Sequence, residues 1–261
     1  MIAHSIVAVG VAVLLVAGCA TPATPDVDEA ALQRVRVSLI AEDRIAWDKP
    51  FDTSRKPVAY IRFFGVRTGM TVLDLGAAAG YTTEILAAAV GPTGRVYAQI
   101  DDPVVRLQNG FFDRTLKQRI GPEGIRRGNI IYWHRELDDA GLSNVDLVHW
   151  GFNLHDYYYQ ENEENEADGV YVQQVLARAY SALRPGGILA VSDHIGGAGK
   201  DNRKLHRIEI VHIVAQIERA GFRIDARSDL LANPEDDHSL NVFADAIYRT
   251  TDRVLIRAVR K

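Results

Sequence analysis

Cysteine is almost absent from the 261-residue sequence, which contains only Cys19. A single cysteine cannot form an intramolecular disulfide bond, and it offers no second thiol for redox chemistry or metal binding. Clusters of lysine and arginine are also absent, and the net charge is only -4. Because a protein that follows a phosphate backbone needs such clusters, we expect no nucleic acid partner.

Long hydrophobic runs are missing apart from one at the N-terminus. Residues 6–17 are an unbroken run of Ile, Val, Ala, Gly and Leu. The run has the length of a signal-peptide core, and it is too short to cross a bilayer, which requires about 20 residues. It ends in Val-Ala-Gly-Cys at residues 16–19, which resembles the signal of bacterial lipoproteins, although no basic residue precedes the run. The alternative is a short apolar N-terminus with an incidental cysteine.

The lipoprotein resemblance implies that Cys19 is lipidated and anchors the protein in the bacterial cell envelope. Ala20, in place of an aspartate, resembles lipoproteins sent to the outer membrane, so we expect an anchored protein that faces the periplasm. Residues 1–19 are then a signal peptide, and residues 20–27 form a proline-containing tether. Residues 28–261, with enough apolar material for one core, are predicted to form a single domain.

Helical patterns begin after the tether. The spacing of Leu32, Val35 and Leu39 predicts a helix within residues 28–47, and residues 48–57 are predicted to break it. The other predicted helices are residues 58–64, 81–90, 103–119, 169–183 and 204–220.

Strand patterns alternate with these helices. Repeated strand-helix units force a parallel sheet that is covered on both faces, and the last segment alternates like an antiparallel strand with a solvated face. The predicted fold is therefore α/β, with a Rossmann-like, doubly wound, mainly parallel seven-stranded sheet and an antiparallel last strand. The predicted strands are residues 71–75, 95–100, 129–134, 146–150, 188–192, 222–227 and 253–259.

A loop of small residues follows the first predicted strand. Residues 74–80 read Asp-Leu-Gly-Ala-Ala-Ala-Gly and lead into a helix. Small residues allow a ligand to approach the backbone, and the N-terminus of the helix offers unpaired N–H groups, so a nucleotide would fit. A tight turn without a ligand is the simpler alternative. A phosphate-binding Walker loop is excluded because Gly-Lys-Ser/Thr is missing, whereas a dinucleotide fold stays possible.

The loop resembles the first motif of class I S-adenosylmethionine (SAM)-dependent methyltransferases, acid-x-Gly-x-Gly-x-Gly. Asp74, Gly76 and Gly80 match the motif, and Ala78 replaces its middle glycine. The resemblance extends over residues 55–261. It is closer to a bacterial group of predicted methyltransferases that often carry export signals. The residues that match this group are Arg55, Lys56, Pro57, Asn153, Leu154, His155, Asp156, Asp193, His194, His206 and Arg207.

This resemblance implies SAM as the cofactor. The family has an acidic residue at the end of the second strand, which accepts hydrogen bonds from the ribose, but Ile100 stands there in this chain. Asp101 reaches the ribose only if the strand ends in a bulge, and Glu136 matches the position that contacts the adenine amino group. A surface carboxylate is the alternative for both. The predicted cofactor-binding residues are Asp74, Gly76, Ala77, Ala78, Gly80, Tyr81, Asp101, Glu136 and Asn153.

The candidate catalytic residues follow the fourth and fifth strands, which are neighbours in this fold. We predict His155 as a general base, oriented by Asp156 or Asp193, with His194 beside them. His206 and Arg207 are predicted to bind an anionic group of the substrate. Capping of strand ends is the alternative role. A metal site built from His155, Asp156, Asp193 and His194 is also conceivable, but spacing alone does not establish it, and no metal is predicted.

The predicted location conflicts with the predicted cofactor, because SAM is not made outside the cytoplasm. We expect an envelope-anchored methyltransferase that acts on a small molecule or a cell-envelope component. The main alternative is a non-catalytic envelope lipoprotein that retains the fold and binds another ligand in the cleft. A cytoplasmic enzyme with a misleading N-terminus is the third possibility.

Overall fold

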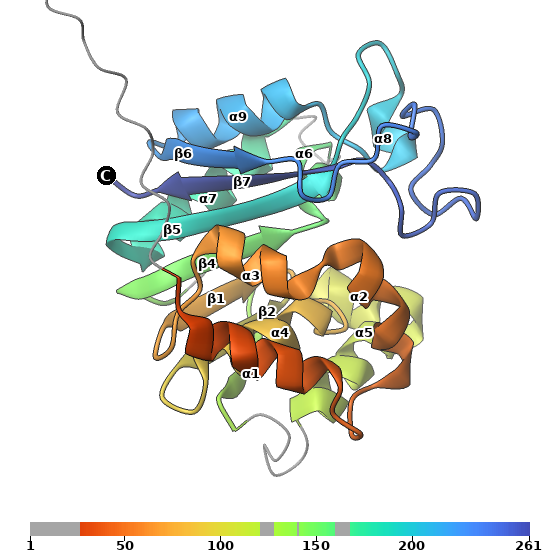
Figure 1. Ribbon diagram of the computed structural model, residues 1–261. Coiled ribbons are helices and arrows are strands. Elements are labelled where there is room, and N and C mark those ends of the chain that lie inside the picture. Colours follow the sequence, from red (N-terminus) through yellow and green to blue (C-terminus); the bar gives the residue numbers. More distant parts are fainter. Residues whose placement is uncertain (1–26, 121–127, 140, 160–167) are drawn as a thin grey trace, which may run out of the picture.

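The computed structural model describes residues 27–120, 128–139, 141–159 and 168–261 of the chain. Its strands are β1 (Thr71–Leu75), β2 (Arg95–Ile100), β3 (Ile130–His134), β4 (Val145–Gly151), β5 (Leu183–His194), β6 (Arg223–Ser228) and β7 (Arg253–Val259). They form one sheet in the order β3-β2-β1-β4-β5-β7-β6 (Figure 1). Neighbouring strands are parallel, except that β7 is antiparallel to β5 and β6. The predicted Rossmann-like α/β fold is confirmed.

Helices connect the parallel strands and lie on both sides of the sheet (Figure 1). A short 3₁₀ helix, Ala46–Asp48, comes directly before the second α-helix. The α-helices are α1 (Glu29–Leu39), α2 (Lys49–Arg55), α3 (Pro57–Phe64), α4 (Tyr81–Val90), α5 (Asp102–Ile120), α6 (Leu154–Tyr158), α7 (Val170–Ala182), α8 (Asn202–Leu205) and α9 (Ile210–Arg219).

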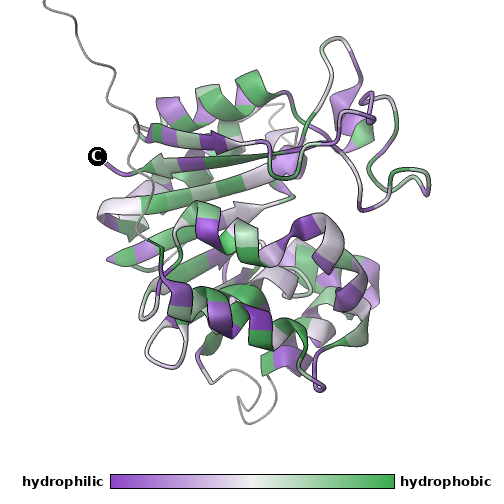
Figure 2. Ribbon diagram, viewed as in Figure 1, coloured by the Kyte–Doolittle hydropathy of each residue, from purple (hydrophilic) through white to green (hydrophobic). Residues whose placement is uncertain are grey.

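Each face of the sheet has its own hydrophobic core, because successive residues of a strand point to opposite sides. Val72 in β1 packs with residues of α1, α3 and α4, whereas the next residue, Leu73, packs with residues of α7 and α9. Figure 2 shows hydrophobic and hydrophilic residues alternating along α1 and α9, as expected for helices with one buried side. The burial of both faces explains why most residues in the middle of the parallel strands are apolar.

The N-terminal helices differ from the prediction. α1 ends at Leu39, well before residue 47, and the predicted break at residues 48–57 is wrong because α2 occupies most of it. Pro50 lies in the first turn of α2, where its missing N–H group breaks no helical hydrogen bond. Lys56 then adopts a left-handed conformation, with φ 45°, which separates α2 from α3.

The helix predicted at residues 204–220 is two helices, α8 and α9. Between them His206 adopts a left-handed conformation, with φ 53°. Ile208 then forms an isolated parallel bridge with Ile195, next to β5. The connection is therefore held against the sheet by tertiary contacts that helical periodicity does not reveal.

α5 follows its predicted course but is interrupted. Leu107, Gln108, Asn109 and Gly110 have non-helical backbone angles, and the last three have positive φ. An Asn-Gly pair tolerates the left-handed conformation that such an interruption requires. The interruption matters for function because Leu107 and Gln108 line the pocket described below.

Asp28 supplies a testable contribution to the stability of α1. Its carboxylate accepts hydrogen bonds from the backbone N–H of Ala31 and from both the N–H and hydroxyl of Thr68. We expect Asp28→Ala to lower the free energy of unfolding by about 1 kcal/mol at neutral pH, because an N-cap is lost. Glu42→Ala, at an exposed position outside the helices, should have almost no effect.

The effect of Asp28→Ala on the free energy of unfolding should depend on pH. Hydrogen bonds from Thr68, and then from Ala31, lower the pKa of Asp28 from 3.8 to about 2. A lowered pKa in the folded state means that the contribution of Asp28 is complete above its unfolded pKa and disappears as the pH falls towards 2. Urea denaturation of both proteins should therefore give a difference that shrinks in acid. A difference that stays constant across this range would contradict the assignment.

Within the described residues, no helix is both long enough and apolar enough to cross a membrane. The predicted signal peptide and Cys19 lie outside the described residues, as does nearly all of the predicted tether. Lipid anchoring therefore stays a prediction.

Candidate active site

A pocket of about 810 Å³ opens at the carboxyl ends of β1, β4 and β5. The order of the sheet reverses between β1 and β4, and open α/β sheets bind their ligands at such a switch point. The volume lies within the range of about 300–1,000 Å³ that is usual for small-molecule sites. The pocket is lined by the loop after β1, the ends of β4 and β5, the helix α2 and parts of residues 242–253.

The loop after β1 forms the floor that the sequence predicts, and Asp74, Gly76, Ala77, Ala78, Gly80 and Tyr81 all line the pocket. Gly76, Ala78 and Gly80 have positive φ angles of 60°, 48° and 83°. Asn153, after β4, donates a hydrogen bond from Nδ2 to the carbonyl of Gly76, at 3.2 Å. Its Oδ1 is buried without a hydrogen-bond partner. A ligand that carries an ammonium or amide N–H group would satisfy this oxygen.

Asp74 belongs to a buried hydrogen-bond network. Its carboxylate accepts a hydrogen bond from the hydroxyl of Thr83, at 2.6 Å, and lies 2.6 Å from Nδ1 of His149. Nε2 of His149 is 2.6 Å from the hydroxyl of Tyr60, which is 2.8 Å from the hydroxyl of Ser192. Burial raises the pKa of Tyr60 well above its ordinary value of 10.0, so its phenol keeps its proton. The protein itself therefore occupies both oxygens of Asp74.

His149 and Tyr60 are absent from the residues predicted from the sequence. One clue to His149 was available, because it is an imidazole within the otherwise apolar end of the strand β4. A polar side chain in a strand that is buried on both faces needs a partner, which here is Asp74. Nothing local marks Tyr60, which reaches the network from α3.

Asp101 lies close to the pocket but does not line it. It is buried at the end of β2, where one carboxylate oxygen accepts a hydrogen bond from the N–H of Val104 at 3.1 Å. The other oxygen accepts a hydrogen bond from the hydroxyl of Tyr157 at 3.0 Å. Asp101 thus caps the helix α5, and a nucleoside ribose would have to displace Tyr157 to reach it.

Glu136 is exposed and also lies outside the pocket lining. Partial burial and the charges of Asp101 and Asp102 raise its pKa. The pocket wall beyond β2 is instead apolar, which suits the flat face of an adenine better than its polar edge. The apolar residues of this wall are Pro103, Val104, Leu107, Phe111 and Phe112, and Gln108 is a polar residue beside them.

The structure brings together the catalytic residues predicted after β4 and β5. Nδ1 of His155 lies 2.6 Å from Oδ1 of Asp193, and the backbone N–H of His155 donates to Oδ2 of Asp193, at 2.8 Å. Burial opposes the charging of His155, but the carboxylates of Asp193 and Asp156 outweigh it and raise its pKa to about 10. A protonated imidazole cannot act as a general base, so the predicted role of His155 requires this proton to be removed.

His194 has the opposite electrostatic environment. Burial, followed by the positive charges of His155, Arg253 and Arg207, lowers its pKa well below 6.5. Its Nδ1 is 2.7 Å from the hydroxyl of Thr251, and its ring lines the pocket. His194 is therefore the neutral imidazole of the site, and this protonation state suits a proton acceptor.

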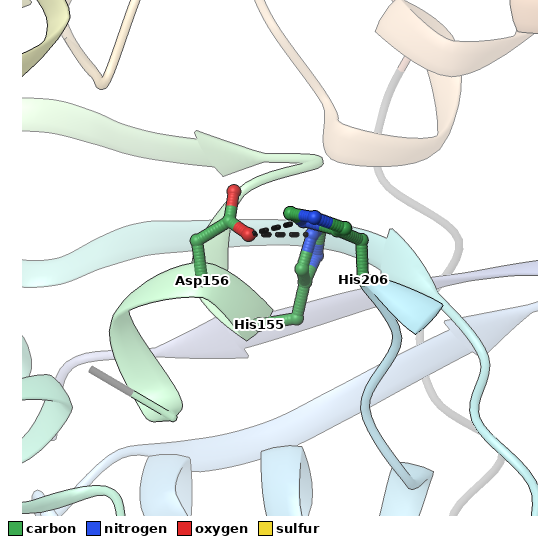
Figure 3. A group of neighbouring side chains, drawn as sticks. All are labelled: His155, Asp156 and His206. Carbon is green, nitrogen blue, oxygen red and sulfur yellow. Dashed lines mark hydrogen bonds and ion pairs between the residues drawn. The ribbon is translucent and has the colours of Figure 1, made fainter. Parts of the chain in front are cut away.

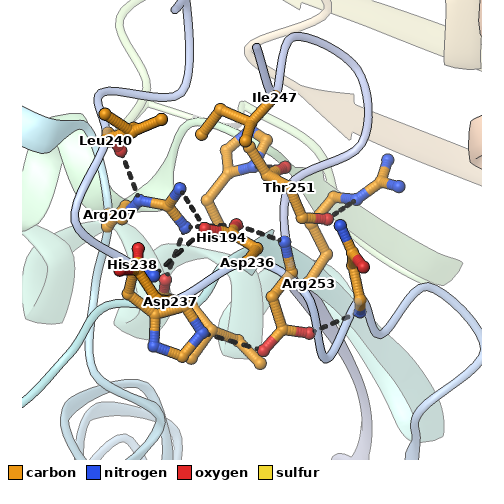
Figure 4. Close-up of polar contacts among 12 residues, drawn as sticks. His194, Arg207, Asp236, Asp237, His238, Leu240, Ile247, Thr251 and Arg253 are labelled. Carbon is orange, nitrogen blue, oxygen red and sulfur yellow. Dashed lines mark hydrogen bonds and ion pairs between the residues drawn. The ribbon is translucent and has the colours of Figure 1, made fainter.

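His206 and Arg207, the predicted anion-binding pair, lie apart from the pocket lining. Nδ1 of His206 is 2.7 Å from Oδ1 of Asp156. The guanidinium of Arg207 is fully buried, where it pairs with Asp236 at 3.0 Å and donates to the carbonyls of Ile195 and Leu240 (Figure 4). Arg207 thus fixes the segment after β5, and its donors face the protein, away from the pocket.

Other arginines do line the pocket, namely Arg55, Arg249 and Arg253. The guanidinium of Arg55 lies over the rings of Tyr81 and Phe152, at 4.6 and 5.0 Å, and forms no ion pair with any carboxylate of the described residues. Burial lowers the pKa of Arg55, and burial together with the charge of Arg55 lowers that of Arg253 to about 10. Nε of Arg249 is buried without a hydrogen-bond partner. Desolvated positive charges of this kind favour an anionic ligand.

The chain has the fold of class I SAM-dependent methyltransferases. The features that define this fold are the order of the strands, the pocket at the switch point and the glycine-containing loop after β1. No protein-family model and no curated protein matches the sequence. Solved structures with this fold do match. A SAM-dependent methyltransferase from Aquifex aeolicus superposes with a TM-score of 0.57 and 17% identity, over 88% of this chain and 98% of that chain.

Two further structures are similar. A SAM-dependent methyltransferase from Mesorhizobium loti has a TM-score of 0.53 and 15% identity, over 79% of this chain and 98% of that chain. Human N-acetylserotonin methyltransferase in complex with SAM has a TM-score of 0.53 and 16% identity, over 89% of this chain and 57% of that chain. At these identities the likeness establishes the fold.

Proposed function

We propose that this protein is a SAM-dependent methyltransferase that acts on a small molecule or a component of the cell envelope. The observation that carries the proposal is the pocket at the switch point, which joins the loop Gly76–Gly80 to the histidine and carboxylate residues after β4 and β5. A nucleoside bound over this loop would lie next to groups that can hold or accept a proton. Methyl transfer needs this proximity, because it is an in-line displacement by a deprotonated nucleophile.

Different pocket residues would bind the different parts of SAM and accept the proton. The apolar wall beyond β2 would receive the adenine, and the free Oδ1 of Asn153 would accept a hydrogen bond from the amino group of the methionine part. Arg55 and Arg253 would hold its carboxylate. His194, which is neutral, would accept the proton of the acceptor group.

Calorimetric titration of the purified protein with SAM and with S-adenosylhomocysteine tests the proposal. We expect binding in the micromolar range, and Asp74→Ala should abolish it because the loop loses its anchor to Thr83 and His149. The fold of this variant is checked by circular dichroism. Absence of heat with either compound, from folded wild-type protein, would reject the proposal.

Arg55 allows a sharper prediction. We expect Arg55→Met to weaken binding of S-adenosylhomocysteine by about tenfold or more, which corresponds to one charge-assisted hydrogen bond of about 1.5–3 kcal/mol. Binding of 5′-methylthioadenosine, which lacks the carboxylate, should be unchanged. Arg67→Met, at an exposed position before β1, is the matched control. Equal weakening for both ligands would show that Arg55 does not hold the carboxylate.

The second candidate is a non-catalytic envelope lipoprotein that uses the same pocket for another anionic ligand. The observation in its favour is that the oxygens of Asp101 are engaged by Val104 and Tyr157, while Ile100 stands at the usual acidic position. Ribose recognition is then lost or weakened. The calorimetric titration decides between the two candidates, since only the methyltransferase binds the nucleosides.

The proposed location is the cell envelope, with a lipid on Cys19 and the domain facing the periplasm. Metabolic labelling with radioactive palmitate should mark the wild-type chain and leave Cys19→Ser unlabelled. Label that persists in Cys19→Ser would reject lipidation at this residue.

A further inference from the structure

Three potential metal ligands converge at the rim of the pocket. Nε2 of His155, Oδ1 of Asp156 and Nδ1 of His206 all lie within 4.8 Å of one another. Oδ1 of Asp156 is 3.2 Å from Nε2 of His155 and 2.7 Å from Nδ1 of His206. Figure 3 shows the three side chains pointing toward one another, from α6 and from the segment after α8.

The buried Nε2 atom of His155 indicates that the cluster binds a further atom or ion. The residue is only 3% exposed, and its Nε2 is buried without a hydrogen bond, since the nearby Asp156 oxygen lies outside hydrogen-bond geometry. Its other ring nitrogen is fixed by Asp193, at 2.6 Å, so the ring cannot turn Nε2 elsewhere. Among the described residues, the only polar contact of Nε2 is the ion pair with Asp156, and a buried nitrogen without a hydrogen bond is costly unless something binds it. In metal sites, a carboxylate behind the histidine holds the ligand in this way.

His206 is also held in an unusual position. It has a left-handed backbone, with φ 53°, a conformation that is unfavourable for a residue with a Cβ. The buried ion pair between Arg207 and Asp236 anchors the adjoining residue and so maintains this conformation. Strain of this kind is typical of functional sites. Here it turns the imidazole of His206 toward Asp156.

We propose that His155, Asp156 and His206 bind a divalent transition-metal ion, for which Zn²⁺ is the reference. Two histidines and a carboxylate are a ligand set found for catalytic zinc, which keeps a further coordination position for water or substrate. His155 and Asp156 line the pocket, so that position would face it. Asp193 and His194, the other ligands considered from the sequence, are not part of this site. Asp193 contacts Nδ1 of His155, and Nδ1 of His194 contacts the hydroxyl of Thr251.

This inference rests on the proposed function and assigns the metal a task in it. A hydroxyl group of the acceptor would bind the ion, which would favour transfer of the hydroxyl proton to His194 in the same pocket. The acceptor oxygen would then form a bond to the methyl carbon of SAM. The bond between that carbon and sulfur would break, and its electron pair would stay on sulfur, leaving a neutral thioether. The acceptor class is therefore a hydroxyl-bearing molecule that can reach both the metal and the nucleoside.

Titration of the untagged full chain with Zn²⁺, after treatment with a chelator and without SAM, tests the site. We expect one ion per chain, bound in the micromolar range or tighter. His206→Ala and Asp156→Asn should each weaken binding by at least about 100-fold, since loss of a direct ligand exceeds the 10–100-fold effect of outer-shell changes. Circular dichroism and the melting temperature without metal check that both variants fold.

The matched control is His134→Ala. His134 forms an exposed pair with Asp102, at 2.8 Å, but is not part of a three-ligand cluster among the described residues. Its removal should leave the Zn²⁺ affinity unchanged. Absence of stoichiometric Zn²⁺ binding, or binding that His206→Ala and His134→Ala alter equally, overturns the inference. Zinc binding without nucleoside binding would support the metal site and reject the proposed methyltransferase. Nucleoside binding without zinc binding would support the methyltransferase and reject the metal site.

Discussion

Replacement of Arg119 by alanine is expected to lower the free energy of unfolding by about 3–5 kcal/mol. The guanidinium is fully buried beneath the loop after β1, where it pairs with Asp48 at 2.6 and 2.7 Å and with Glu84 at 2.6 Å. It also donates to the carbonyl of Ala79. Alanine would remove the cation that pairs with the buried carboxylate of Asp48, and an uncompensated buried charge is costly.

Urea denaturation of the purified variant measures this loss. Arg36→Ala is the matched control, because Arg36 forms an exposed pair with Glu29 at 3.7 Å. Exposed pairs contribute about 0–1 kcal/mol, so its stability should be nearly that of the wild type. Similar losses in the two variants would mean that the buried network does not support the fold.

Replacement of Gly76 by alanine should weaken nucleoside binding by about tenfold or more, provided that the chain binds SAM as proposed. A Cβ at this position would lie 2.2 Å from Nδ2 of Asn153. The asparagine would have to turn away, which breaks its hydrogen bond to the Gly76 carbonyl and moves its free Oδ1. The φ of 60° adds about 1–2 kcal/mol of backbone strain.

Gly199→Ala separates the two effects. Gly199 has a similar φ of 73°, but a Cβ there would meet nothing within 4 Å. Both variants should lose stability through the backbone, and only Gly76→Ala should lose affinity in a calorimetric titration with S-adenosylhomocysteine. Unchanged affinity in Gly76→Ala would remove Asn153 from the nucleoside site.

The strands were predictable because their information is local. β1 and β7 have the predicted bounds, since β1 is a short apolar run and β7 alternates in sequence. The solvated face expected for β7 is wrong, because residues 253–258 are all buried. The loop after β1 was predictable because its information is also local. The break at His206 was not, because the helical pattern of residues 204–220 continues through it, and the competing interactions come from Ile195 and Asp236, which are distant in the sequence.

The candidate site was predictable only in part. Residues that follow the strands β4 and β5 converge because the topology requires it, so His155 and Asp193 could be placed together from the sequence. Arg55 and Tyr60 could not, because they reach the pocket and the Asp74 network from α2 and α3, which precede the sheet. Their positions depend on how those helices pack against the sheet, and no local pattern encodes that packing.

The position of β7 has a consequence for the order of folding. β7 lies between β5 and β6, and among the described residues β6 has no other strand beside it. The edge of the sheet cannot close until β7 has been synthesised and has inserted between these two strands. Until then a folding chain would expose β5 to aggregation, and a truncation before Arg253 would leave β6 without a place in the sheet.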